Sequence, residues 1–169
     1  MIARCLCLSI AVILVIACNS PFDGANRAST SPSASKSLYL GSLGSAGCKP
    51  GAAFHGWPVQ GGFQEVGVDS GRGSLWALFF TPVPPPTGKD IKVVWRMTGS
   101  GDFTFSGSDS SGQVIHPTRD PQPHGVNGSN WNHPGFEVGT GFNFPHSGCW
   151  NIHVSRSDVA GDLWLEVAS

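Results

Sequence analysis

The sequence predicts an all-β domain in which two sheets pack as a sandwich, and three observations support this prediction. Charged residues make up only 12% of the chain while 23 residues are glycine, a composition that suits an exported domain with many tight turns. Short β-prone runs alternate between apolar and polar residues, which indicates strands with one buried and one wetter face. Glycine, proline, serine and asparagine separate these runs at the spacing of a sandwich of about 7–8 short strands.

The candidate strands all lie in the C-terminal part of the chain. We expect them at residues 63–68, 75–81, 91–98, 102–106, 113–116, 140–144, 149–155 and 162–167. In the run IKVVWRM at 91–97, every second residue is apolar, whereas Lys92 and Arg96 fall on the opposite side. The run DLWLEV at 162–167 alternates in the same way. This period of two is the pattern of a strand and not of a helix.

Two proline-containing segments interrupt the pattern. The run PVPPP at 82–86 forms a stiff connector between two candidate strands. The longer segment 116–139 contains Pro117, Pro121 and Pro123, and we assign no strand to it. An irregular segment of this length in a compact domain is usually functional or locally disordered.

The first seventeen residues, MIARCLCLSIAVILVIA, have the pattern of an export signal. Arg4 supplies the positive n-region, and the apolar run after it is shorter than the roughly 20 residues that a membrane-spanning helix needs. The run ends in Val15-Ile16-Ala17-Cys18, which resembles the lipobox of bacterial lipoproteins. The resemblance implies that residues 1–17 are removed as a signal peptide. It also implies that the Cys18 thiol receives diacylglycerol and that the new N-terminus is often acylated too, with palmitate for example.

A lipid anchor at Cys18 would decide where the mature chain resides. Because two or more acyl chains hold a protein stably at a membrane, the resemblance implies the extracytoplasmic face of the cell membrane or of the outer membrane. Asn19, and not an aspartate, follows the cysteine, so the sequence does not decide between the cell membrane and the outer membrane. The alternative is an ordinary secretory signal with a chance cysteine. Removal of Arg4 leaves nine of the ten basic residues against eleven acidic ones, which gives no reason to expect nucleic acid as a partner.

The mature chain divides into a tether and one domain. Residues 18–45 are expected to form the lipidated cysteine and a flexible, serine-rich tether, because they offer too little apolar surface to offset the entropy lost on ordering. Leu38-Tyr39-Leu40 is the only apolar cluster in this segment and the one part that could dock on the domain. Residues 46–169 are expected to form the sandwich.

Two cysteines, Cys48 and Cys149, remain in the mature domain, so only one pairing is possible. A disulfide between them would close a loop of about one hundred residues and contribute up to roughly 4–5 kcal/mol of stability. The spacing Cys149-x-x-x-His153 offers an alternative, because cupredoxins, which are also sandwiches, bind copper through a Cys and a His a few residues apart. Met97, the one methionine of the mature chain, lies inside a candidate strand and not after His153. We therefore favour the disulfide.

A metal site without cysteine is a further alternative. Neutral imidazole binds zinc, copper and nickel ions well. Five histidines fall within 38 residues of one another, namely His116, His124, His133, His146 and His153. They show no tight ligand spacing such as H-x-H or H-E-x-x-H. The leading expectation is therefore a protein without a cofactor, and the alternative is a metal-binding envelope protein that uses these loop histidines.

The segment GSNWNHPG at 128–135 is the best candidate surface for a ligand. Asn130, Trp131, Asn132 and His133 combine an apolar platform with hydrogen-bonding groups, as sugar and peptide sites do. In the alternative interpretation, Trp131 folds back over one end of the sandwich, because large aromatic side chains are highly buried on average.

Signatures of catalysis are weak in this sequence. It contains no G-x-S-x-G nucleophile elbow, and Glu137 has no obvious second carboxylate beside it for glycoside hydrolysis. The C-terminal run from Ser129 to Val167, in which a Gly-Cys-Trp step opens the penultimate strand, is similar to segments of uncharacterised exported bacterial proteins with an immunoglobulin-like sandwich. That resemblance implies an immunoglobulin-like fold. Together these features predict a non-catalytic binding or envelope-interaction module of unknown ligand.

Overall fold

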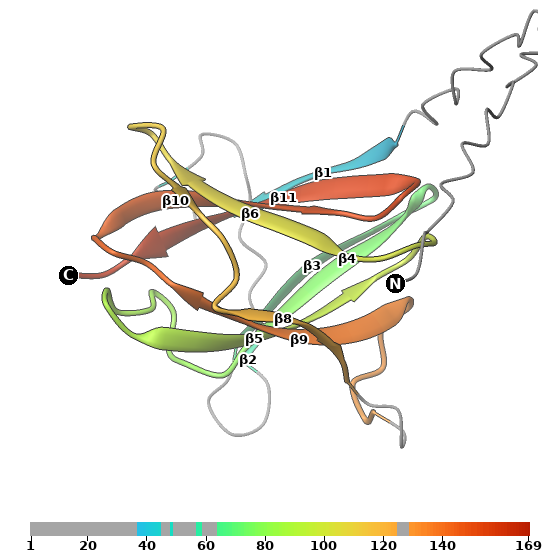
Figure 1. Cartoon of the computed structure of the whole chain (residues 1–169). Coiled ribbons are helices and arrows are strands. Elements are labelled where there is room, and N and C mark those ends of the chain that lie inside the picture. The colour runs from blue at the N-terminus through green and yellow to red at the C-terminus, as the bar shows by residue number, and fades with distance from the viewer. Residues whose placement is uncertain (1–36, 45–47, 49–56, 59–63, 125–128) are drawn as a thin grey trace, which may run out of the picture. The chain divides into compact units, whose positions relative to one another are not determined.

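The structure, a computed structural model, describes residues 37–44, 48, 57–58, 64–124 and 129–169. Within these ranges the chain forms eleven strands in two sheets and no helix. Figure 1 shows the arrangement of the strands. None of the described residues therefore belongs to a helix that could cross a membrane. The predicted all-β class and the two-sheet sandwich are confirmed, whereas the immunoglobulin-like assignment within that class stays a prediction.

The first sheet has five strands in the order β1-β11-β10-β6-β7. These are β1 (Leu38–Gly44), β11 (Val159–Val167), β10 (Gly148–Ser155), β6 (Thr104–Asp109) and β7 (Val114–Ile115). All neighbours in this sheet are antiparallel except β1, which runs parallel to β11. A parallel pair cannot be joined by a tight turn, and β1 and β11 are separated in the chain by the nine other strands.

The second sheet has six strands in the order β2-β3-β4-β5-β9-β8, and all its pairs are antiparallel. These are β2 (Trp57–Pro58), β3 (Gln64–Ser70), β4 (Gly73–Phe79), β5 (Asp90–Met97), β9 (Phe136–Asn143) and β8 (Arg119–Pro123). Strand β8, which is at the edge of this sheet, lies beside β9 in Figure 1.

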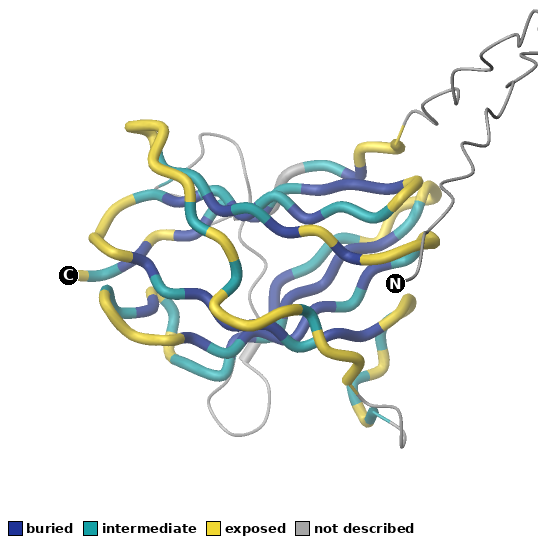
Figure 2. Tube along the Cα trace, viewed as in Figure 1, coloured by how far each residue is buried: buried dark blue, intermediate teal, exposed yellow. Residues whose placement is uncertain are grey.

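The core fills the space between the sheets with the apolar residues that the period-two pattern places on one face. Trp95 of β5 and Trp150 of β10 are both 0% exposed and belong to one continuous apolar cluster. Figure 2 shows this alternation of buried and more exposed positions along the strands. Full burial of such a side chain stabilises a fold by about 1.5–3 kcal/mol relative to leaving it in water.

The structure forms strands in several segments where the sequence predicted none, β2 among them. Residues 38–44, assigned to the tether, form β1, and Leu40 is buried in the core at 4% exposure. Pairing with a strand more than one hundred residues away leaves no local pattern, so the sequence could not reveal it. Within 116–139, residues 119–123 form β8 despite Pro121 and Pro123, because an edge strand tolerates residues without an N–H donor. Cys18, the signal peptide and the tether up to residue 36 lie outside the described residues.

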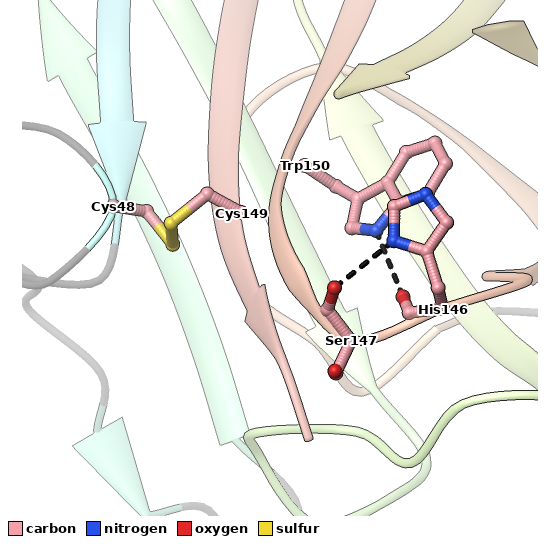
Figure 3. The surroundings of a disulfide bond; sticks show 5 residues. All are labelled: Cys48, His146, Ser147, Cys149 and Trp150. Carbon is pink, nitrogen blue, oxygen red and sulfur yellow. Dashed lines mark hydrogen bonds between the residues drawn. A yellow bond between two sulfur atoms is a disulfide. The ribbon is translucent and has the colours of Figure 1, made fainter. Parts of the chain in front are cut away.

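The predicted disulfide is confirmed, because Cys48 is bonded to Cys149 with a Cα–Cα distance of 5.2 Å. Figure 3 shows that Cys149 lies next to Trp150 at the start of β10. The indole N–H of Trp150 donates to the carbonyl oxygen of His146 at 3.2 Å, which holds the turn before this strand. Because a sulfur atom in a disulfide is no thiolate, the copper alternative built on Cys149 and His153 is wrong.

Candidate functional site

A pocket of about 350 Å³ lies between the residues that lead into β6 and the strands β8 and β9. Five apolar side chains line it: Phe103, Pro121, Pro123, Phe136 and Val138. Asp102 and Arg156 are the charged residues of its lining. A mostly apolar concavity with a few fixed polar groups is the usual form of a small-molecule site.

The aromatic walls of the pocket are held by the core on one side and open to solvent on the other. Phe103 is 9% exposed, and its ring stacks on that of Phe105 with centroids 5.7 Å apart. Phe136, the first residue of β9, is 51% exposed, and its ring centroid lies 6.5 Å from that of Phe103. Phe136 therefore places exposed apolar surface in the lining of the pocket.

Arg156, in the turn between β10 and β11, is fixed in the pocket by hydrogen bonds to backbone carbonyls. Its Nε and Nη2 donate to the Gly101 oxygen at 3.0 and 2.8 Å, and its Nη1 donates to the Met97 oxygen at 3.1 Å. The guanidinium carbon lies 4.9 Å from the ring centroid of Phe103 and 5.8 Å from that of Phe136. In the described part of the chain no carboxylate forms an ion pair with this guanidinium.

Gly101, whose carbonyl oxygen accepts two hydrogen bonds from Arg156, has a backbone conformation that requires glycine. Gly101 has a φ of +78°, and a Cβ atom there would lie 2.1 Å from the Ser157 Oγ. Both the left-handed backbone and the close approach require glycine. The next residue, Asp102, is exposed, and its carboxylate has no hydrogen bond or ion pair with any described residue. The pocket therefore combines an apolar floor, a fixed cation and an unpaired anion.

The loop that the sequence singled out lies on the outer face of the six-stranded sheet. The Trp131 indole N–H donates to Oε2 of Glu65 at 2.6 Å. The His133 ring stacks on Trp76 with centroids 3.6 Å apart and an interplanar angle of 11°. Asn130 and Asn132 are exposed. These contacts favour an anchoring role for Trp131, over the face of the sheet and not over the end of the sandwich.

A buried carboxylate, Glu137, joins this loop to the pocket wall. Its Oε2 accepts from Arg96 Nε at 2.8 Å, and its Oε1 contacts His124 Nδ1 at 2.6 Å. Arg96 Nη1 also donates to the carbonyl oxygen of His133. Although burial raises the pKa of the Glu137 carboxyl, hydrogen bonds from His124, Ser129 and Arg96 outweigh it and hold the pKa below its ordinary value.

This ionic network positions Phe136, which directly precedes Glu137. Gly135 completes the connection with a φ of +107°, and a Cβ atom there would lie 2.4 Å from the backbone of Met97. The contacts of the loop and of the Glu137 carboxylate therefore hold the backbone from which the exposed Phe136 ring projects. In the sequence Glu137 stands as a lone acid, and its partners Arg96 and His124 are too far along the chain for a local pattern to reveal them.

The five histidines proposed as metal ligands are not brought together. Four of them contact four different carboxylates: His124 with Glu137, His133 with Glu65, His146 with Asp109 and His153 with Asp162. His116 is exposed. Among the described residues no three His, Cys, Asp or Glu side chains are placed to hold a metal ion. The predicted histidine set therefore does not form one site in this part of the chain.

The comparisons with known proteins provide no relative. The chain matches no protein-family model, and no curated protein is significantly similar to it. Function must therefore be inferred from the chemistry of the site, because a sandwich fold hosts many unrelated activities.

Proposed function

We propose that this protein is a lipid-anchored, extracytoplasmic and non-catalytic binding module that captures a small ligand in the pocket beside Phe136. The observation that carries the proposal is the position of Arg156, which is fixed by three hydrogen bonds against two aromatic rings. Preorganised groups of this kind bind a ligand at little cost in side-chain entropy. The low charge of the chain and the resemblance of residues 1–18 to a lipoprotein signal support a role in the cell envelope.

Binding is tested with a library of aromatic fragments and the purified full chain in lipid nanodiscs, with empty nanodiscs as the blank. Phe136→Ala removes an exposed ring, so it should abolish most fragment binding with little loss of stability. Val114→Ala is the matched control, because Val114 is 56% exposed on β7 and does not line the pocket. Fragments that bind both variants equally well would show that the pocket is not the binding site.

The membrane anchor is tested separately at the lipobox cysteine. Cys18→Ser should prevent incorporation of labelled palmitate and release the chain from the membrane fraction, because the acylated thiol is lost. Cys7→Ser is the control, since Cys7 lies in the segment that the signal peptidase removes. Retention of the label in Cys18→Ser would exclude the lipoprotein assignment while leaving the binding pocket unaffected.

A further inference from the structure

We infer that the pocket selects small zwitterions with an aromatic or branched apolar group, the chemical class of the free apolar α-amino acids. This inference rests on the proposed binding function and deepens it by naming the ligand class. Three features of the pocket lining carry it: the cation of Arg156, the anion of Asp102 and the apolar residues Phe103, Pro121, Pro123, Phe136 and Val138.

The Arg156 guanidinium is available to an anion. A guanidinium has five N–H donors, of which three are used by the carbonyl oxygens of Gly101 and Met97. The two donors that remain suit a carboxylate, which pairs with arginine more strongly than a neutral acceptor does. Because the side chain is partly buried against Phe103 and Phe136, its charge is incompletely hydrated.

The Asp102 carboxylate supplies the opposite charge in the same pocket. Arg156 is bonded to the carbonyl of Gly101, the residue directly before Asp102, yet the two charged groups form no ion pair with each other. A ligand that carries only one charge would satisfy one of these groups and be repelled by the other. An ammonium and a carboxylate on the same ligand satisfy both.

The remaining lining fits the side chain of such a ligand. Phe136 and Val138 of β9 provide apolar surface, and Pro121 and Pro123 of β8 add a wall whose backbone has no N–H donor at these positions. The volume of about 350 Å³ is at the lower end of the range for small-molecule sites, roughly 300–1,000 Å³. The pocket therefore suits a single ligand the size of an amino acid.

Four probes with the same ring test the assignment by equilibrium dialysis on the full chain in nanodiscs. They are L-phenylalanine, 3-phenylpropionate, phenethylamine and 3-phenylpropanol. We expect L-phenylalanine to bind about tenfold or more tightly than each of the others, since each charge-assisted contact is worth at least that factor.

Two variants should separate the charges. Asp102→Asn should weaken the binding of L-phenylalanine and phenethylamine about tenfold and leave the binding of 3-phenylpropionate unchanged or tighter. The substitution removes no contact within the described structure. Arg156→Lys keeps the charge but loses the paired N–H donors of the guanidinium. It should therefore weaken the binding of L-phenylalanine and 3-phenylpropionate only. Lys89→Met, at an exposed position outside the pocket lining, is the control and should change none of the four.

The outcomes distinguish this inference from the function on which it rests. Equal binding of all four probes, with no effect of Asp102→Asn, would overturn the zwitterion assignment and leave an apolar pocket. Binding of library fragments in a manner that depends on Phe136, without binding of L-phenylalanine, would do the same. Failure of every fragment and probe to bind would overturn the proposed function itself.

Discussion

Replacement of Glu137 by glutamine tests how the pocket wall is held in place. The Glu137 side chain is 4% exposed, and it links Arg96, at 2.8 Å, to His124, at 2.6 Å. Glutamine preserves the size but removes the charge, and its single amide oxygen can accept from only one of these partners. Because the Arg96 side chain is 18% exposed and water compensates part of the loss, we expect a decrease in the free energy of unfolding of about 2 kcal/mol.

The same substitution should change the pH dependence of stability. The pKa of Glu137 is lowered in the folded protein, so ionised Glu137 stabilises the fold fully above the unfolded pKa of about 4.3. This contribution is lost as the pH falls through the lower, folded pKa. The wild-type chain should therefore lose stability between about pH 5 and the folded pKa more steeply than Glu137→Gln.

Urea unfolding, followed by tryptophan fluorescence at neutral and acidic pH, measures both effects. Glu166→Gln is the matched control: Glu166 lies on β11 with an exposed side chain, and its replacement should change the free energy by less than about 0.5 kcal/mol. If Glu137→Gln proves as stable as the control at neutral pH, the buried ion network does not hold the loop and the reasoning fails.

Three further substitutions test other parts of the fold. Replacing Cys48 and Cys149 together by serine should lower the free energy of unfolding by up to about 4.7 kcal/mol, because the bond closes a loop with a sequence separation of 101; a loss under about 1 kcal/mol in calorimetry would contradict this. Gly67→Ala places a Cβ atom 2.1 Å from the Trp76 ring and should cost about 1–3 kcal/mol, measurable as a lower Tm, with Gly71→Ala, which meets no atom within 4 Å, as the control. Trp131→Phe removes one indole hydrogen bond to a carboxylate and should cost about 1.5–3 kcal/mol in urea unfolding; an unchanged midpoint would mean that the loop is not anchored there.

Much of the fold could be predicted because the alternation of apolar and polar residues along a strand shows which of its faces is buried. In the run from Ile91 to Met97 the inward positions are apolar, and the structure buries all four of them to 2% exposure or less. The disulfide followed from a count, since Cys48 and Cys149 are the only two cysteines of the predicted domain at 46–169. The strands β1 and β8 escaped prediction because each depends on a partner strand and not on its own composition.

The sequence by itself therefore determined the class of fold, the inward faces of its main strands and the one possible disulfide, because periodicity and residue type act over a few neighbouring positions. Only the tertiary structure decided where the pocket lies. Its walls come from residues 101–103, 121, 123, 136, 138 and 156, which are adjacent only after β9 pairs with β8 and Arg156 donates to Gly101. Such contacts depend on distances across the folded chain, and no local pattern of residues encodes a distance.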